Sequence, residues 1–256
     1  NDGTLAERMK AASTTFNDVE RSVDDLAAIL YTSGTTGRSK GAMLSHGNLA
    51  SNATTLVDYW RFSAKDVLIH ALPIYHTHGL FVATNVLLMA GGTMLFLPKL
   101  DPEAIMKLMP RATSMMGVPT FYTRLLTRPD LTPEATKHMR LFISGSAPLL
   151  AETHREWRAK TGHAILERYG MTETNMNISN PYDGDRIAGT VGFPLPGVEA
   201  RVTDPETGVP IADGEIGMIE IRGPNVFKGY WRMPEKTAAE FRADGFFITG
   251  DLGKKD

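Results

Sequence analysis

From Leu26 to about residue 170, short apolar runs alternate with longer stretches in which apolar residues recur at helical spacing. The short runs predict buried strands and the longer stretches predict helices. The expected strands are 26–30, 67–72, 93–97, 114–118, 140–144 and 163–167. The expected helices are 5–12, 46–60, 80–89, 101–109, 121–126 and 149–161. This alternation favours an α/β fold, with a mostly parallel sheet covered by helices on both faces.

The pattern changes near residue 185. From Gly189 onward, short alternating runs lie between turn signals such as Asp204-Pro-Glu-Thr-Gly208. The expected strands here are 198–202, 214–222 and 246–248, and a helix is expected over 234–241. These features predict a smaller antiparallel β section. We therefore expect an α/β nucleotide- and acyl-binding subdomain over 1–185 and a β-rich subdomain over 186–256.

Composition narrows the function classes. The net charge of −2 gives no basic surplus, so nucleic acid is not the expected partner. The absence of cysteine excludes disulfides, thiolate catalysis and cysteine-type zinc sites. The apolar stretch 80–97 contains Gly91 and Gly92 and predicts a buried helix and strand rather than a membrane span. With no signal pattern at its start, the chain is expected to be cytoplasmic and to have no membrane partner.

A glycine-rich motif follows the first predicted strand. The segment Tyr31-Thr-Ser-Gly-Thr-Thr-Gly-Arg-Ser-Lys-Gly41 combines glycines, hydroxyl side chains and one lysine. Such a loop offers backbone N–H groups and a cation to phosphate oxygens, and a helix is expected directly after it. The spacing differs from that of a Walker loop, because two residues separate Gly37 from Lys40. The alternative is a flexible surface turn.

A pair of histidines follows the second predicted strand, in Pro73-Ile-Tyr-His-Thr-His-Gly79. In an extended segment His76 and His78 would point the same way. Ligands collect at the carboxyl ends of parallel strands, which favours an acyl or carboxylate pocket beside His76. Two alternatives stay open, a metal site and purely structural histidines.

Two further motifs end predicted strands. In Glu167-Arg-Tyr-Gly-Met-Thr-Glu-Thr174, Tyr169 could stack on a purine and Glu173 could hold Mg²⁺; the alternative is a helix capped by Thr172. In Phe246-Phe-Ile-Thr-Gly-Asp-Leu252, Asp251 could bind ribose hydroxyls, although such a segment alone is usually a turn.

In this order, the motifs resemble those of the AMP-forming acyl-CoA synthetases and adenylation domains. Within that superfamily the chain is most similar to the malonyl-CoA synthetases, through segments 75–79, 118–126, 180–186 and 223–232. Family members continue past the ribose aspartate into a small domain that carries a catalytic lysine. The resemblance therefore implies a truncated adenylate-forming core that binds nucleotide, with strongly impaired catalysis. Surfaces left by the missing parts would favour self-association.

The resemblance also implies the reaction and its residues. A carboxylate, malonate or a similar short dicarboxylate, would attack ATP·Mg²⁺ to give an acyl-adenylate, and the thiol of CoA would then displace AMP. Lys40, Glu173 and His76 are the implied catalytic residues, and Thr32 and Glu173 the implied metal ligands. The implied nucleotide-binding residues are Thr32, Ser33, Gly34, Thr35, Thr36, Gly37, Lys40, Gly145, Ser146, Ala147, Tyr169, Gly170, Met171, Thr172 and Asp251. The implied acyl-site residues are His76, Thr77 and Met176.

A dicarboxylate leaves a second negative charge in the pocket, which needs a positive partner because burying it unpaired is costly. Arg124 is the candidate, with His76 or Arg186 as helpers, because an arginine fork matches a carboxylate. The alternatives are that Arg124 is a solvated helix residue and that Met176 is core packing. At the level of function, the alternatives are a medium-chain or aryl acyl-CoA ligase, a non-catalytic nucleotide-binding module, and a domain that binds no ligand.

Overall fold

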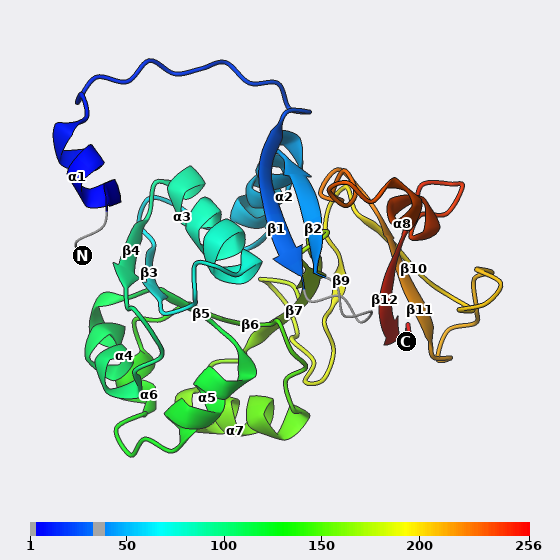
Figure 1. The fold of residues 1–256 in the computed structure, drawn as a ribbon. Coiled ribbons are helices and arrows are strands. Elements are labelled where there is room, and N and C mark those ends of the chain that lie inside the picture. The colour runs from blue at the N-terminus through cyan, green and yellow to red at the C-terminus, as the bar shows by residue number, and fades with distance from the viewer. Residues whose placement is uncertain (1–3, 33–38) are drawn as a thin grey trace.

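The computed structural model describes residues 4–32 and 39–256. Its centre is a seven-stranded sheet in the order β4-β3-β5-β6-β7-β8-β9 (Figure 1). The strands are β3 (Val67–His70), β4 (Thr93–Phe96), β5 (Ser114–Gly117), β6 (Leu141–Ser144), β7 (Leu166–Met171), β8 (Asn175–Ser179) and β9 (Phe193–Pro194). The pairs from β4 to β7 are parallel, and β7-β8 and β8-β9 are antiparallel. The predicted α/β class with a mostly parallel sheet is confirmed.

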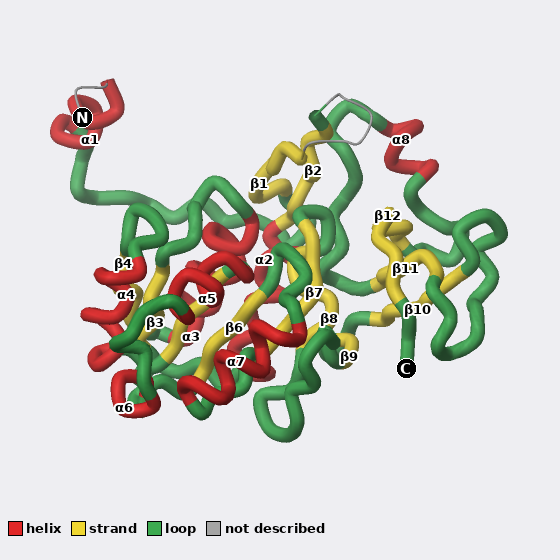
Figure 2. The backbone as a smooth tube through the Cα atoms, turned by 90° about the horizontal axis from the view of Figure 1, so that it is seen from below, coloured by secondary structure: helices red, strands yellow, loops and turns green. Residues whose placement is uncertain are grey.

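Helices cover both faces of this sheet (Figures 1 and 2). On one face lie α2 (His46–Tyr59), the π-helix η1 (His78–Ala83) and α3 (Thr84–Ala90). On the other lie α4 (Pro102–Leu108), the 3₁₀-helix η2 (Met109–Arg111), α5 (Pro119–Leu126), α6 (Pro133–Thr136) and α7 (Ala151–Thr161). The strands β5 and β6 are buried along their whole length, because both faces of a parallel sheet are covered.

Aromatic packing fixes one helical layer against the sheet. The ring of Trp157 on α7 contacts Tyr122 on α5 and Phe142 on β6 edge-to-face, with centroid distances of 5.0 and 4.9 Å. The hydroxyl of Tyr122 donates to the Ile143 carbonyl at 2.6 Å, so its polar end is satisfied inside the core. This packing fixes β6, and Ser146 in the loop after it lines the candidate site.

The glycine-rich segment differs from the predicted strand, loop and helix. It joins two antiparallel strands, β1 (Leu26–Thr32) and β2 (Lys40–Ser45), with Thr32 opposite Lys40. The strand β2 thus lies between this segment and α2. Its residues Ala42 and Leu44 are buried in a second apolar cluster, which also contains Phe227. Ser45 caps α2 in a reciprocal capping box with Asn48, as its sequence position predicts. Residues 33–38, predicted to bind phosphate, lie outside the described part of the chain.

Besides β2, two further strands were not expected from the sequence, β8 and β9. The strand β8 reads Asn-Met-Asn-Ile-Ser, which is too polar for a buried-strand pattern. It is buried nonetheless, and most of its side-chain polar atoms have internal partners, Asn175 Nδ2 excepted; Asn177, for example, donates to Thr174 Oγ1 at 2.7 Å. The short strand β9 pairs with it. The division into subdomains stays a prediction, with the change from the large sheet to the next falling between Pro194 and Glu199.

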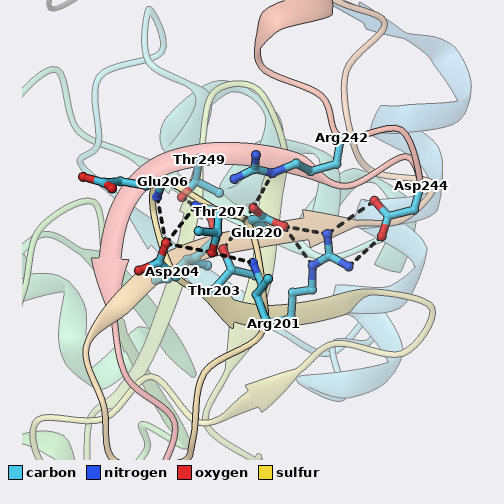
Figure 3. Close-up of polar contacts among 11 residues, drawn as sticks. Arg201, Thr203, Asp204, Glu206, Thr207, Glu220, Arg242, Asp244 and Thr249 are labelled. Atoms are coloured by element: carbon cyan, nitrogen blue, oxygen red, sulfur yellow. Dashed lines mark hydrogen bonds and ion pairs between the residues drawn. The ribbon is translucent and has the colours of Figure 1, made fainter.

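The predicted antiparallel section is a three-stranded sheet of β10 (Glu199–Thr203), β11 (Gly217–Arg222) and β12 (Phe247–Gly253), with α8 (Pro234–Ala239) beside it. A buried carboxylate, Glu220, joins its parts (Figure 3). Glu220 accepts from Nε of Arg201 and Nε of Arg242, each at 2.8 Å, and from Thr203 Oγ1 at 3.0 Å. Arg201 also pairs with Asp244 at 2.6 Å. The network ties the segment after α8 to the sheet that carries Asp251.

The N-terminal helix α1 (Thr4–Ala11) has no buried residue and is joined to β1 by an extended segment (Figure 1). Among the described residues, no helix combines the length and apolarity that crossing a membrane requires.

Candidate active site

A cavity of about 220 Å³ lies where β3, β6 and β7 end, at the carboxyl edge of the parallel strands. It is lined by His76, Thr77, Ser146, Arg168, Gly170, Met171, Thr172, Glu173 and Met176. All of these except Arg168 belong to the residues predicted from the motifs. The structure therefore brings the histidine motif (73–79) and the motif 167–174 together around one cavity.

Arg168 is the cavity residue that the sequence reasoning missed. Its side chain is only 3% exposed. Among the described residues, Nε and Nη2 have no hydrogen-bond partner, and no carboxylate raises the pKa of the guanidinium. Burial lowers its pKa to about 9, so it stays cationic at neutral pH. A buried charge without a partner is costly, and this one lines a cavity, which indicates that an anionic ligand completes it.

The loop after β6 leaves room for this guanidinium. A Cβ atom at Gly145 would lie 2.3 Å from Cζ of Arg168, so a larger residue here would displace the guanidinium. Ser146 follows in the left-handed region with a φ of 66°, a conformation that non-glycine residues rarely adopt. Its hydroxyl lies 3.2 Å from Nδ1 of His78. Ser146, predicted on the adenine side, thus lines the cavity, and Gly145 lies against the guanidinium of Arg168.

The two histidines do not point the same way, because the segment is not extended. Thr77 has helical backbone angles and His78 begins η1, which turns the two rings apart. His78 is buried and its pKa is lowered well below the ordinary value by burial and by the charge of Arg168. His76 is exposed at the cavity, and its Nδ1 accepts from the His78 N–H at 3.3 Å. In the neutral ring this leaves Nε2–H of His76 as a donor.

The metal alternative finds no support in the described residues, where no three histidine, aspartate or glutamate side chains are grouped to hold an ion. His78 has a structural partner in Ser146, while His76 lines the cavity. The structure therefore separates the roles of the two histidines.

The motif 167–174 forms the end of β7 and a tight turn into β8, so Thr172 does not cap a helix. A Cβ atom at Gly170 would lie 1.9 Å from the Asn175 carbonyl oxygen, so glycine allows this turn to close. Met176 on β8 is both core and cavity wall, because it is buried and lines the cavity. The turn delivers Glu173 to the side of the cavity that faces the β1-β2 hairpin.

Glu173 joins the cavity to the lysine of the glycine-rich segment. Glu173 lies 3.0 Å from the Tyr230 hydroxyl, and Nζ of Lys40 donates to that hydroxyl at 3.1 Å. Glu240 contacts both partners, at 2.6 Å from the hydroxyl and 3.3 Å from Nζ. Burial raises the pKa of Glu173, opposed by hydrogen bonds to its carboxylate and by the charge of Lys40. A carboxylate and a lysine in one cluster fit a metal-bound polyphosphate.

The residues predicted to bind the purine and the ribose are also in contact with each other. The hydroxyl of Tyr169 on β7 donates to Oδ2 of Asp251 on β12 at 2.7 Å. Asp251 is exposed, and Ala147 is exposed in the loop after β6. Tyr169 has a raised pKa, mainly because of burial. The side chains expected around the nucleoside therefore come from both sheets.

Two predicted arginines are not brought to the cavity. Arg124 is exposed on α5, and it is not among the lining residues. Arg186 donates to the carbonyls of Pro181, Ala164 and Tyr182 at 3.1, 2.8 and 2.9 Å, so its guanidinium fixes a loop. The substrate roles of Arg124 and Arg186 stay predictions, because the sequence does not show which arginine faces the cavity.

The mixed α/β sheet and the antiparallel section form the fold of adenylate-forming enzymes. The chain belongs to the AMP-binding enzyme family, whose model matches residues 2–231. The malonate–CoA ligase of Arabidopsis thaliana is 41% identical over 254 residues, which cover 91% of this chain and 41% of that protein.

Two solved structures are similar. The crystal structure of ATP-bound MatB from Rhodopseudomonas palustris is 75% identical with a TM-score of 0.97, and covers 99% of this chain and 50% of that one. A malonyl-CoA ligase complex with methylmalonyl-CoA and AMP bound is 41% identical with a TM-score of 0.87, and covers 94% and 52% of the two chains. The chain thus spans about half the length of the proteins that it matches.

Proposed function

We propose that this chain forms the nucleotide- and acyl-binding part of an ATP-dependent ligase that joins malonate, or a similarly short dicarboxylate, to CoA. The observation that carries the proposal is the buried guanidinium of Arg168 at the cavity, without a partner among the described residues. A dicarboxylate has one carboxylate to react and one to neutralise this cation. The similarity to malonate–CoA ligases supports the same substrate class.

The size of the cavity also favours a short acid. About 220 Å³ is below the roughly 300–1,000 Å³ of pockets for drug-sized ligands. A medium-chain acyl group would need a longer apolar channel, and its tail would leave Arg168 unpaired. These two features disfavour the medium-chain and aryl alternatives.

In the proposed first step, one carboxylate oxygen of the acid forms a bond to the α-phosphorus of ATP. The bond between that phosphorus and the bridging oxygen breaks, and pyrophosphate leaves. Arg168 holds the second carboxylate at the buried end of the cavity, and Nε2–H of His76 orients the reacting one at the exposed end. The protein thereby aligns two anions that repel one another in water.

The phosphates are assigned to the side of the cavity where Glu173 and Lys40 lie. Lys40 supplies positive charge, and Glu173 with Thr32 would hold Mg²⁺, which neutralises the polyphosphate when bound. Tyr169 and Asp251 would hold the adenine and ribose. In the second step the thiol of CoA loses its proton to solvent, its sulfur forms a bond to the acyl carbon, and the bond between that carbon and the phosphate oxygen of AMP breaks.

Calorimetric titration of this chain with ATP·Mg²⁺, and then with single acids, tests the proposal. Malonate is expected to bind at least about tenfold more tightly than propionate, which lacks the second carboxylate. Hexanoate binding more tightly than malonate would contradict the dicarboxylate assignment and support a medium-chain ligase. Binding of ATP with no acid binding at all would instead indicate a nucleotide-binding module.

A further inference from the structure

Glu240 lies outside all four motifs, yet it contacts the lysine of the glycine-rich segment from 200 residues away in the chain. Its Oε1 is 3.3 Å from Nζ of Lys40, and Nζ also lies 4.4 Å from the centre of the Tyr230 ring. The side chains of Lys40 and Glu240 are only 15% and 17% exposed, so this pair is weakly screened by solvent. Lys40 is therefore already occupied before a nucleotide arrives.

A second cation is in place to receive Glu240. Nζ of Lys236 lies 2.7 Å from the same oxygen, Oε1, and the lysine is 44% exposed. The other oxygen of Glu240 shares the Tyr230 hydroxyl with Glu173. Because that hydroxyl carries one hydrogen, it can donate to only one carboxylate at a time.

The charges of this cluster balance without a ligand, with two lysines, Lys40 and Lys236, against two carboxylates, Glu173 and Glu240. A polyphosphate that enters beside Lys40 adds several negative charges close to Glu240. The Lys40–Glu240 contact must then weaken, because one ammonium group cannot serve both anions fully. Lys236 can keep Glu240 neutralised at that moment.

We propose that Glu240 is an exchangeable counter-ion of the ATP site: it holds Lys40 in position without nucleotide and shifts to Lys236 when the phosphates of ATP bind Lys40. This inference rests on the proposed function, in which Lys40 contacts the phosphates. Glu240 acts through Lys40 and does not touch the reacting atoms. It sets the ATP affinity by competing with the phosphates for one cation.

Calorimetric titration with ATP at fixed Mg²⁺ tests this role in three variants. In Glu240→Gln, Lys40 loses its competing anion, and ATP is expected to bind about threefold to tenfold more tightly. In Lys236→Gln, Glu240 loses its second cation and stays on Lys40, so ATP is expected to bind about threefold more weakly. The matched control is Glu235→Gln, which removes the same charge from an exposed position of α8, the helix that ends just before Glu240, and should change the affinity less than twofold.

The difference between Glu240→Gln and the wild type should shrink as salt is raised, because the effect is electrostatic. Weaker ATP binding by Glu240→Gln would overturn the proposal; a loss that scales with Mg²⁺ would mark Glu240 as a metal ligand. Equal affinities in Glu240→Gln and Glu235→Gln, or a wild type that binds no ATP, would also overturn it. A wild type that binds ATP but not malonate would contradict the proposed substrate and leave this inference standing.

Discussion

Glu220 and Arg168 are both almost completely removed from solvent, with 0% and 3% of their surfaces exposed, but only Glu220 is paired. Glu220 receives hydrogen bonds from two arginines and a threonine within the β10-β11-β12 sheet. Arg168 has two nitrogens without a partner among the described residues, and it borders a cavity. A buried charge that serves the fold is neutralised by the fold. A buried charge that lines a cavity and lacks a protein partner is suited to neutralisation by a ligand.

The largest expected effect is the loss of malonate affinity when Arg168, rather than another arginine, is replaced. Arg168→Met is expected to weaken malonate binding by roughly 30-fold to 1,000-fold, because the second carboxylate would be buried without its partner. Titration calorimetry with ATP·Mg²⁺ present measures this loss. Arg158→Met, an exposed arginine on α7, is the matched control and should bind malonate as the wild type does. Loss of binding in Arg124→Met but not in Arg168→Met would show that the exposed arginine is the partner after all.

The same comparison predicts a loss of stability at Glu220. Glu220→Met leaves Arg201 and Arg242 facing an apolar side chain, and should lower the free energy of unfolding by about 3 kcal/mol. Urea denaturation measures the change. A variant as stable as the wild type would mean that the network in Figure 3 makes no net contribution to the free energy of unfolding. Pairing would then not distinguish Glu220 from Arg168.

A third buried charge lies between these extremes. Burial raises the pKa of Glu167 to about 7, opposed by one hydrogen bond from the Gly189 N–H at 3.2 Å. Its pKa is higher in the folded than in the unfolded chain, so the protonated form favours folding. That contribution is complete below about pH 4.5 and is lost as the pH rises through about 7.

Glu167→Gln removes this dependence. The variant should be more stable than the wild type by roughly 3 kcal/mol at pH 8, and the difference should vanish towards pH 4. Unfolding curves at a series of pH values check the trend. A difference that is constant with pH would show that ionisation of Glu167 is not its cause.

The smallest expected effect comes from a substitution that displaces the guanidinium of Arg168 without removing it. In Gly145→Ala the new Cβ would lie 2.3 Å from Cζ of Arg168, so the guanidinium must shift. We expect malonate affinity to fall about tenfold, because the fork no longer matches the carboxylate geometry. Titration of ATP·Mg²⁺ alone serves as the internal control, since a lost purine contact would lower that affinity as well. Unchanged malonate affinity would mean that the position of Arg168 is not critical.

The periodic parts of the fold could be predicted from the sequence. Strands such as 114–117 and 141–144 have apolar centres, Met115-Met116 and Leu141-Phe-Ile143, and helix α2 carries its own cap at Ser45. The strand β8 could not be predicted, because its buried amides have partners that are distant in the sequence; Asn225 Nδ2, for example, donates to Asn177 Oδ1 at 2.9 Å. The strand β2 was missed because Gly41-Ala-Met-Leu is equally compatible with the start of a helix.

Much of the candidate site could also be predicted, since its residues follow predicted strands. Its charge partners could not. Arg168 is adjacent to Tyr169 in a motif that had been singled out, and a charged residue within a buried strand was the available signal. Glu240 carried no such signal, because only the folded chain brings it to Lys40. Ion pairs between distant segments depend on topology, which local patterns do not encode.

Thermal unfolding of the wild type and Arg168→Met, each with and without malonate in the presence of ATP·Mg²⁺, tests the central claim most directly. The account predicts that the variant without malonate melts at a higher temperature than the wild type, because a buried unpaired charge has been replaced by an apolar side chain. It also predicts that malonate raises the melting temperature of the wild type alone. A variant that melts lower than the wild type and is still stabilised by malonate would contradict the account.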